Sequence, residues 1–439
     1  MTATAGIYTL GCKVNQYESE AIAEALEAAG ITVCPPTDLC SLYIINTCTV
    51  TAESDRKARQ FIRRALGQNP DALILVTGCF AQVDPEQIAA IAGVDYICGN
   101  REKMSVVSAA LALLEQGCKN DRPTIAVPAL DGAGFETMRI TRFGRTRAYV
   151  KIEDGCESRC AYCIIPRARG KIRSKAPADV IAEVRALAEA GCREVVLTGI
   201  ETSAYGRDLG DYGLADLLCD LDRETGIGRI RLGSLDPSLI RDRFVERIAP
   251  LPSIAPHFHL SLQSGADHVL NLMRRPYSAK MAREAVERLR TAFPTLGLTT
   301  DVIVGFPQET EADFEETATF LREARFLDAH IFAYSRRPGT EAADMPGQID
   351  EAVKRDRSAR LIAAQNTLHS TILDEAVAAA TPSPVLFETQ QDGWAQGHTP
   401  AFYEVRVRAD RDLRGLELPV RPISHDGHTL IGELCFPID

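Results

Sequence analysis

Residues 151–170 read KIEDGCESRCAYCIIPRARG, a stretch that holds Cys156, Cys160 and Cys163 in the spacing C-x3-C-x2-C. Three thiolates in one loop can bind three irons of a four-iron cluster. The fourth iron then needs a non-protein ligand, because the loop offers no fourth Cys or His. A zinc site is the alternative, but structural zinc takes four protein ligands, commonly with cysteines paired as C-x2-C. The spacing therefore predicts an iron-sulfur cluster with one open coordination position.

Six short apolar segments lie between about residues 138 and 345, and a helical stretch follows each of them. They are RAYVKIED (147–154), EVVLTG (194–199), RIRLGS (229–234), HFHLSL (257–262), TTDVIVGF (299–306) and DAHIFAY (328–334). Strands that alternate with helices form a parallel sheet, so we expect an open, partial (β/α)6 barrel. Functional groups of such barrels lie at the carboxyl ends of the strands. The candidates at these ends are Cys156, Thr198, Gly199, Ser234, Ser261, Gln263, Gly305 and Pro307.

The first 128 residues repeat a strand-helix pattern in which three strands end at a cysteine. IYTLGC ends at Cys12, SLYIINTC at Cys48 and DALILVTGC at Cys79. The carboxyl ends of parallel strands meet at one edge of a sheet, where open α/β sheets bind ligands. We therefore expect the three thiols to converge on a second cluster site. A single cysteine after a strand is usually core filler, but three in the same structural position are not.

The last part of the chain has a different, all-β pattern. A long connecting helix precedes four short strands, SPVLFET (383–389), YEVRVRA (403–409), ELPVRPIS (417–424) and TLIGELCF (429–436). This pattern predicts a small β-barrel. The fold class is therefore α/β, with an N-terminal parallel-sheet domain over 1–128, the partial barrel over 138–375 and the small β-barrel over 377–439.

The net charge of the chain is −11, which alone argues against nucleic-acid binding. Residues 138–175, however, hold eleven Lys and Arg against three acids. The cations are Arg139, Arg142, Arg145, Arg147, Lys151, Arg159, Arg167, Arg169, Lys171, Arg173 and Lys175. A basic segment around the cluster loop of an acidic protein predicts a phosphate-binding surface, although a solvated, salt-bridged face is the alternative. Arg56, Arg59 and Arg63 are further candidates for phosphate contacts, at helical spacing.

The segments around the cysteines carry a resemblance to a known family. TLGCKVNQYESE (9–20), NTCTVT (46–51) and TGCFAQ (77–82), followed by the C-x3-C-x2-C loop, resemble the methylthiotransferase branch of the radical S-adenosylmethionine (SAM) superfamily. The resemblance implies two [4Fe-4S] clusters. Cys156, Cys160 and Cys163 would hold the cluster that cleaves SAM to a 5'-deoxyadenosyl radical. Cys12, Cys48 and Cys79 would hold an auxiliary cluster that carries the sulfur or methylsulfide.

The same resemblance implies contacts with SAM. Tyr162 would flank the adenine, and LTGIE (197–201), with Thr198, Gly199 and Glu201, would hold the methionyl amine. DVIVGFP (301–307) would pack on the adenine and ribose. The predicted cofactor-binding residues are Tyr162, Thr198, Gly199, Glu201, Ser234, Gln263, Arg274, Val304 and Gly305. Glu157, Glu201 and Gln308 depart from the residues that are common at these places in the family, and of these Glu201 bears most on the SAM site.

The resemblance also implies the substrate. LGCKVNQYE and TCTVT look most like enzymes that add a methylthio group to N6-threonylcarbamoyladenosine at position 37 of tRNA. Isopentenyladenosine-37 in tRNA and an aspartate of a ribosomal protein are alternatives, and a non-catalytic iron-sulfur RNA-binding protein is an alternative of another class. The threonylcarbamoyl carboxylate needs cationic or hydrogen-bonding partners. Candidate cations after strand ends are Arg274, Arg275, Arg336 and Arg337.

The implied partners are the tRNA anticodon stem-loop, an electron donor such as flavodoxin or ferredoxin, and a sulfur donor that the sequence does not identify. GWAQGHTPAFYEV (393–405) resembles the RNA-binding TRAM module, but residues 381–439 hold five Arg and no Lys against nine acids. This −4 charge predicts a small contribution to phosphate binding. The chain has no apolar stretch near the ~18 residues of a membrane span. Its thirteen cysteines, without a dense disulfide-like array, fit a reducing cytosol and predict a cytoplasmic protein.

Overall fold

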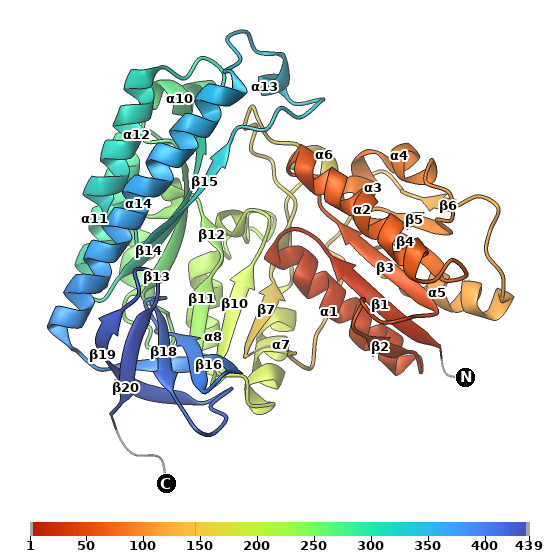
Figure 1. The fold of residues 1–439 in the computed structure, drawn as a ribbon, viewed down its shortest axis with the longest axis horizontal. Coiled ribbons are helices and arrows are strands. Elements are labelled where there is room, and N and C mark those ends of the chain that lie inside the picture. The colour runs from red at the N-terminus through yellow and green to blue at the C-terminus, as the bar shows by residue number, and fades with distance from the viewer. Residues whose placement is uncertain (1–2, 145, 436–439) are drawn as a thin grey trace.

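The computed structural model describes residues 3–144 and 146–435. Along the chain it consists of a parallel sheet covered by helices, an open barrel of parallel strands and a small closed barrel (Figure 1). The α/β class and the three architectures expected from the sequence are confirmed. No helix within the described ranges is both long enough and apolar enough to cross a membrane.

The N-terminal sheet has the strand order β2-β1-β3-β4-β5-β6, and all its pairs are parallel. Its strands are β1 (Thr4–Thr9), β2 (Thr32–Cys34), β3 (Leu42–Thr47), β4 (Leu73–Gly78), β5 (Tyr96–Cys98) and β6 (Thr124–Ala126). Its helices are α1 (Lys13–Ala28), α2 (Ala52–Gln68), α3 (Cys79–Val83), α4 (Pro85–Ala89) and α5 (Ser105–Gln116). Every residue of β3 and β4 is buried, because helices cover both faces of the sheet.

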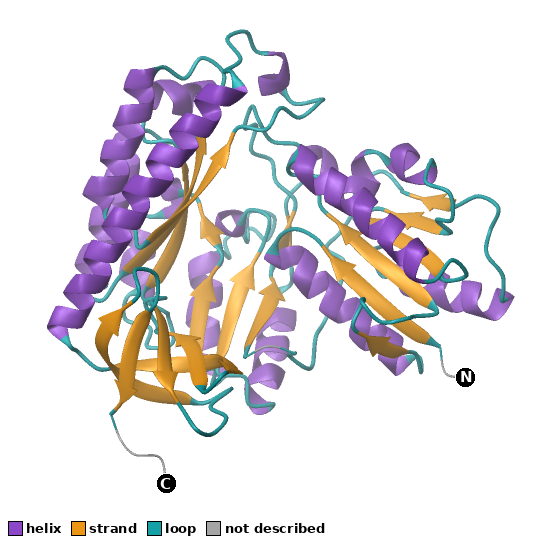
Figure 2. Ribbon diagram, viewed as in Figure 1, coloured by secondary structure: helices purple, strands orange, loops and turns teal. Residues whose placement is uncertain are grey.

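The open barrel consists of two parallel sheets, β7-β10-β11 and β12-β13-β14-β15 (Figure 2). The strands are β7 (Arg147–Lys151), β10 (Glu194–Thr198), β11 (Arg229–Leu232), β12 (Ser234–Leu235), β13 (His257–Gln263), β14 (Gly297–Val304) and β15 (Asp328–Ala333). The helices are α6 (Ile165–Arg169), α7 (Pro177–Glu189), α8 (Leu214–Glu224), α9 (Asp242–Ile248), α10 (Asp267–Leu272), α11 (Ala279–Ala292), α12 (Glu311–Ala324) and α13 (Glu341–Asp344), with the 3-10 turns η1 (Thr202–Ala204) and η2 (Pro237–Leu239). Each of the six apolar segments forms strand, as the sequence predicts.

Side chains alternate between the two faces of the barrel strands. In β13, Phe258 and Leu260 point outward into the helix-covered core, whereas His257 and His259 point inward. Both histidine rings lie within 3.0 Å of the Thr299 hydroxyl of β14. Residues two apart on a strand share a face, so both histidines lie on the inner face of β13, next to Thr299. The outward face packs against the helices and forms the largest core of the molecule.

A short antiparallel pair, β8 (Glu153–Asp154) and β9 (Arg173–Ser174), closes the cluster loop at its base. Gly155 follows β8 with φ +92, and a Cβ atom there would lie 1.9 Å from the Lys171 carbonyl oxygen. Only glycine accepts both the positive φ and this close approach. The turn that begins the cluster loop therefore requires glycine at position 155, directly before Cys156.

The C-terminal part begins with α14 (Glu351–Ala379), so the expected boundary at 375–377 falls inside this helix. The five strands that follow close into a barrel in the order β16-β17-β18-β20-β19. They are β16 (Ser383–Gln391), β17 (Trp394–His398), β18 (Glu404–Arg408), β19 (Glu417–His425) and β20 (Leu430–Leu434). This closed barrel docks at the amino ends of the open-barrel strands (Figure 1).

Acidic residues of the closed barrel are used in this docking. Glu388 lies 2.7 Å from Arg147, and Glu417 pairs with Arg229. Phe402 stacks between His257 and His398, at centroid distances of 4.5 and 4.6 Å. Arginines of the open barrel therefore neutralise part of the negative charge of the closed barrel. Phe402 contributes to the docking through its ring contacts. Two other aromatics are Trp394, which stacks against Arg406 and Arg408, and Tyr403, which packs on the core of the closed barrel.

Candidate iron-sulfur and cofactor site

The three N-terminal cysteines follow the adjacent strands β1, β3 and β4 at one edge of the sheet. Cys12 caps α1 and Cys79 begins α3. Gly11 has φ +103, and a Cβ atom there would lie 3.0 Å from the Cys48 sulfur. Burial raises the pKa of Cys48 to about 12, and the neighbouring Cys79 and Cys12 thiols act in the same direction. The convergence expected from the strand pattern is present in the structure.

Two side chains from outside β1, β3 and β4 donate to Cys79. The Nε atom of Arg169 lies 3.3 Å from the Cys79 sulfur, and Nδ2 of Asn100 lies 3.5 Å from it. Asn100 also donates to the Ala168 carbonyl oxygen at 2.8 Å. Arg169 ends α6, six residues after Cys163, so the loop with one cysteine triad directly contacts a cysteine of the other. Sequence reasoning placed Arg169 on the RNA-binding surface and missed this role.

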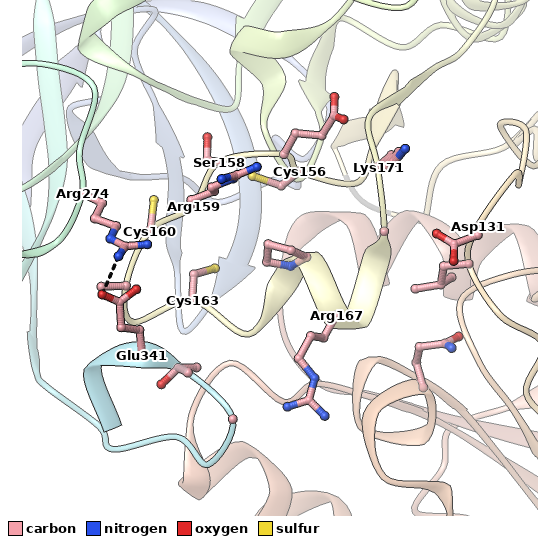
Figure 3. Close-up of a pocket in the computed structure, with 18 residues that line it drawn as sticks. Asp131, Cys156, Ser158, Arg159, Cys160, Cys163, Arg167, Lys171, Arg274 and Glu341 are labelled. Atoms are coloured by element: carbon pink, nitrogen blue, oxygen red, sulfur yellow. Dashed lines mark ion pairs between the residues drawn. The ribbon is translucent and has the colours of Figure 1, made fainter. Parts of the chain in front are cut away.

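The thiols of Cys156, Cys160 and Cys163 all line the same two cavities. The larger one, about 700 Å³, lies between the cluster loop, the N-terminal part of the chain with Asp131, and the segment with Glu341. It is lined also by Arg159, Arg167, Lys171 and Arg274 (Figure 3). The smaller one, about 140 Å³, lies toward the carboxyl ends of the barrel strands. A group bound to the three thiols therefore has access to both the strand ends and the protein surface.

Four of the predicted cofactor residues line the smaller cavity together with the three thiols. They are Tyr162, Glu201, Ser234 and Gln263. Gln263 has φ +64 at the end of β13, a conformation that L residues rarely adopt and that is common at ligand sites. The cavity also has polar lining residues outside the nine predicted cofactor contacts, namely Ser203, Asp236, Ser261 and Arg275. Of these, the sequence marks Ser261 as a strand-end candidate and Arg275 as a candidate cation. Ser261 lies in β13, Ser203 and Asp236 follow β10 and β12, and Arg275 follows α10, so no single sequence signal marks all four.

Glu201 is tied to the cluster loop. Its Oε2 atom accepts from the Cys156 thiol at 2.9 Å and from the Ser158 hydroxyl at 3.1 Å, and burial and Glu201 raise the pKa of Cys156. The Glu201 backbone N–H donates to Oε2 of the buried Glu153 at 2.8 Å. Oε1 of Glu153 has no hydrogen-bond partner among the described residues, and burial raises the pKa of this carboxyl. Glu201 thus contacts Cys156 and lines the smaller cavity.

Thr198 and Gly199 support this arrangement and do not line either cavity. The Thr198 carbonyl oxygen accepts from the Ile152 N–H at 2.9 Å. A Cβ atom on Gly199 would lie 2.6 Å from Oε2 of Glu153. Both residues therefore hold the strand end against the cluster loop.

Val304 and Gly305 also lie outside the residues that line the two cavities. The Val304 side chain packs in the outer core of the barrel, while Ile303 faces inward. Gly305 has φ +71 and donates its N–H to Glu309 at 2.6 Å. Phe306 meets Tyr162 edge to face at a centroid distance of 6.4 Å. Any contact of this segment with a cofactor would come from the backbone or from Ile303.

Two adjacent arginines point to different cavities. Arg275 lies in the smaller one, where it donates to Asp236 at 2.7 Å and to the Cys160 sulfur at 3.2 Å. Arg274, which the sequence reasoning favoured, lies in the larger one and pairs with Glu341 at 2.7 Å (Figure 3). Arg337, another candidate for the substrate carboxylate, is buried and pairs with Asp55 at 2.7 Å. Of the four candidate arginines, only the exposed Arg336 lacks an ion pair among the described residues.

The cations of the segment 138–175 are close together in the sequence but do not form one continuous surface in the structure. Lys151, Arg169, Arg173 and Lys175 are buried, and the expectation that they bind phosphate is wrong. Their partners are Glu18, Asp154 and Glu183. The exposed cations are Arg139, Arg142, Arg159, Arg167 and Lys171, whereas Arg147 is half-buried and pairs with Glu388. Arg145 lies outside the described residues.

The residue types of the two cysteine triads fit iron-sulfur clusters better than a single metal ion. Among the described residues, no three His, Cys, Asp or Glu side chains are placed to bind one metal ion. Cluster ligands bind separate irons and need not meet at a point. Each triad is all-thiol, sits beside polar groups and includes no fourth protein ligand in its loop or sheet edge. The residues present therefore fit two iron-sulfur clusters, each with an open iron.

Comparisons with known proteins agree with this arrangement. Residues 150–321 match the family described as the radical SAM superfamily, and residues 4–99 match the uncharacterized protein family UPF0004. The chain is 42% identical over 427 residues to threonylcarbamoyladenosine tRNA methylthiotransferase MtaB of Bacillus subtilis, covering 95% of this chain and 93% of the relative. It is 36% identical over 442 residues to tRNA-2-methylthio-N(6)-dimethylallyladenosine synthase of Syntrophobacter fumaroxidans, covering 98% and 95%.

A solved structure supports the fold. The radical SAM methyltransferase TsrM from Kitasatospora setae, with tryptophan and a SAM analogue bound, superimposes with a TM-score of 0.56 at 16% identity, over 88% of this chain and 79% of that one. This likeness concerns architecture alone. The family is assigned from the sequence identity to relatives that the chain covers almost completely, together with the two cysteine triads in the expected places. It belongs to the radical SAM methylthiotransferase family.

Proposed function

We propose that this protein adds a methylthio group to C2 of N6-threonylcarbamoyladenosine at position 37 of tRNA. The observation that carries the proposal is the direct link between the two thiol triads, in which Arg169 of the cluster loop contacts Cys79 of the sheet edge. An aromatic C2–H bond of adenine is not acidic enough for acid-base catalysis. Its conversion needs a radical, with the sulfur held close to the carbon that accepts it.

In this proposal Cys156, Cys160 and Cys163 hold the cluster that binds SAM, and Cys12, Cys48 and Cys79 hold an auxiliary cluster. When bound, the two clusters and SAM supply the radical chemistry, the methyl group and the sulfur. The chain itself positions these groups. The cavity residues orient SAM at the strand ends, and α6 holds the sheet edge against the cluster loop.

The SAM contacts proposed on the geometry are Tyr162, Glu201, Ser234 and Gln263, which line the smaller cavity. Thr198 and Gly199 are proposed to hold the Glu201 loop in place. Val304 and Gly305 remain predictions from family resemblance, as does Arg274. Arg275 is added to the set because it faces the smaller cavity and contacts Cys160.

The partners follow from the chemistry. The tRNA would bind through its anticodon stem-loop, and a small redox protein such as flavodoxin or ferredoxin would supply electrons in the cytoplasm. Relatives that carry the threonylcarbamoyladenosine name match at 42% and 39% identity, and one that carries the dimethylallyladenosine name matches at 36%. The prenylated tRNA is therefore the competing substrate that the experiment has to include.

The test offers reconstituted protein three substrates: stem-loops with threonylcarbamoyladenosine, stem-loops with isopentenyladenosine, and a ribosomal-protein peptide. We expect a methylthio product by mass only, or mainly, on the first. Preference for the prenylated RNA or for the peptide would refute the substrate and leave the family intact.

Cysteine variants test the cluster roles in the same assay. The reconstituted protein should bind about eight irons, four per triad. Triple replacement of Cys156, Cys160 and Cys163 by Ala should halve the iron and abolish 5'-deoxyadenosine. Triple replacement of Cys12, Cys48 and Cys79 should halve the iron and abolish sulfur transfer while SAM cleavage persists. Cys118→Ala with Cys219→Ala, outside both triads, is the matched control; full iron in either triple variant contradicts the assignment.

A further inference from the structure

Phe332 of β15 is an exposed aromatic side chain on the inner face of the open barrel. Along this strand Ile331 packs on the outer core, whereas His330 and Phe332 are exposed and, being two residues apart, share the opposite face. His330 contacts one carboxylate oxygen of Asp301, and the other oxygen lies 3.2 Å from the inner-face residue His259. Phe332 is 49% exposed, and it is the one aromatic among the exposed large hydrophobic side chains of the described residues.

On one side, Phe332 adjoins the core that supports the loop of Cys156, Cys160 and Cys163. Phe332 pairs in register with Ile303 of β14, and neighbouring strands lie about 4.8 Å apart. The Ile303 side chain packs on the small core cluster that contains Ala161, and Tyr162 packs on the same cluster. Ala161 and Tyr162 lie between the second and third cysteines of the loop. One strand spacing and one layer of side chains therefore separate Phe332 from this loop.

On the other side, the segment after the second auxiliary cysteine reaches the end of β15. The Ala52 N–H donates to the Ser335 hydroxyl at 3.4 Å. Ser335 is three residues after Phe332, and three residues of extended chain span at most about 11 Å. Arg337 donates to the Thr49 hydroxyl at 2.7 Å, and Thr49 directly follows the auxiliary cysteine. Phe332 therefore lies where the two parts of the chain that carry the thiol triads meet.

Other candidate aromatics for base stacking are already in contact with protein groups. Phe402 lies between two imidazole rings at centroid distances of 4.5 and 4.6 Å, and Trp394 packs on two arginines. Tyr162 lines the smaller cavity, which is proposed for SAM. Within the described part of the chain, Phe332 thus combines an uncovered ring with a position between the two triads.

We propose that Phe332 is the stacking platform for the substrate adenine and holds it between the two thiol triads. The proposal rests on the function proposed above, because that function requires a base close to both triads. Bases of single-stranded RNA loops are commonly splayed out and stacked on aromatic side chains of the protein. The adenine would cover the part of the ring that the protein leaves open.

Stacking also fits what the reaction requires of this position. The carbon that accepts the sulfur has to stay in a fixed orientation, and a flat contact fixes the plane of the base. A phenyl ring offers neither a hydrogen bond nor a charge to the N6 substituent. Phe332 therefore positions the purine and does not distinguish the threonylcarbamoyl group from a prenyl group.

The test compares the dissociation constants of two anticodon stem-loops for the reconstituted protein. One stem-loop carries threonylcarbamoyladenosine at position 37, and the other has an abasic nucleotide there. The ratio of the two constants isolates the contribution of the base, because the remaining RNA contacts are common to both. Phe332→Ala should reduce this ratio by roughly 5- to 150-fold, the range for loss of one base-aromatic stack.

Three further variants separate stacking from other effects. Phe332→Tyr keeps an aromatic ring and should retain the wild-type ratio. Phe332→Leu keeps an apolar side chain without a ring and should lose most of the ratio. Val353→Ala, which removes another exposed apolar side chain on α14, is the matched control and should leave the ratio unchanged. Iron content is measured in every variant, and Phe332→Leu replaces Phe332→Ala if the alanine variant loses iron.

Two results would overturn the proposal. An unchanged ratio in iron-replete Phe332→Ala, or in its replacement, means that the ring does not contact the base, even if both stem-loops bind more weakly. A larger SAM dissociation constant with an unchanged RNA ratio would assign the ring to the cofactor. Failure of the proposed function is distinct, because wild-type protein would then form no methylthio product on the modified stem-loop whatever the ratio.

Discussion

Arg274 and Arg275 are neighbours in the sequence and occupy different environments. Arg274 has φ +57, and this turn sends the two side chains to opposite sides of the cluster loop. Arg275 is 9% exposed and is the partner of Asp236, which is 11% exposed. Arg274 and Glu341 are 53% and 44% exposed. A buried pair whose partner is removed is costly, whereas an exposed pair contributes little.

Replacement of each arginine by methionine tests this difference. Arg275→Met should lower the free energy of unfolding by about 3–5 kcal/mol, because Asp236 is left buried without a counter-charge. It should also weaken SAM binding, since it removes a donor from the smaller cavity. Arg274→Met should change the unfolding free energy by about 0–1 kcal/mol. Denaturant unfolding measures the first quantity and SAM titration the second. Equal effects of the two variants would contradict a role of the smaller cavity, which Arg275 lines, in SAM binding.

At the scale of single residues, the sequence predicts the cluster cysteines better than the side chains that contact them. The spacing of Cys156, Cys160 and Cys163 is local and can be read directly. The contacts of Glu201 with Cys156, and of Glu153 with the Glu201 backbone, join residues 45 and 48 positions apart. No local pattern identifies such pairs. Glu201 was a candidate because of its motif, whereas Glu153 had no signal of its own.

At the scale of elements, α6 is the connection between the two cysteine triads. This short helix packs on α3, which begins at Cys79. Arg169 at its end is fully buried and donates to Cys79, to Asn15 at 2.5 Å and to Glu18 at 2.6 Å. Strand ends were predictable from the alternation of strands and helices. The docking of α6 was not, since it depends on two sheets that meet only in the folded molecule.

Arg169→Met should affect both stability and the auxiliary cluster. We expect a loss of about 3–5 kcal/mol in unfolding free energy, because Glu18 and Asp154 lose a buried counter-charge. The midpoint potential of the auxiliary cluster should become more negative, since hydrogen bonds and positive charge near cluster sulfurs favour the reduced form. Redox titration followed by electron paramagnetic resonance measures the potential. Arg167→Met, an exposed neighbour on the same helix, should change neither quantity, and a wild-type potential in Arg169→Met would argue against the sulfur contact.

At the scale of the whole molecule, charge along the sequence differs from charge on the surface. The segment 138–175 is basic in sequence, but Lys151, Arg169, Arg173 and Lys175 neutralise buried carboxylates. Glu18, one of these carboxylates, lies 133 positions before Lys151. Composition identifies an excess of cations and cannot say which ones have partners across a domain interface. The same holds for the closed barrel, in which Glu388 and Glu417 pair with arginines of the open barrel.

The exposed cations that remain predict where tRNA phosphates bind. Arg159, Arg167 and Lys171 line the larger cavity beside the cluster thiols, so RNA held there is also held near the chemistry. Reversal of these three charges should reduce the slope of log K against log salt by about 2 to 3, because each lost phosphate contact removes a little less than one released counterion.

The matched control reverses three exposed arginines of the closed barrel, Arg408, Arg414 and Arg421. This barrel has a net charge of −4 over residues 381–439, so its few arginines lie in a negative field that opposes phosphate binding. The control should therefore leave the salt slope nearly unchanged, even though the number of charges altered is the same. Binding of tRNA is measured at several salt concentrations for both variants and the wild type. A large loss of slope in the control, with the cavity variant unaffected, would place the phosphate-binding surface on the closed barrel and the RNA path on the opposite side from the larger cavity.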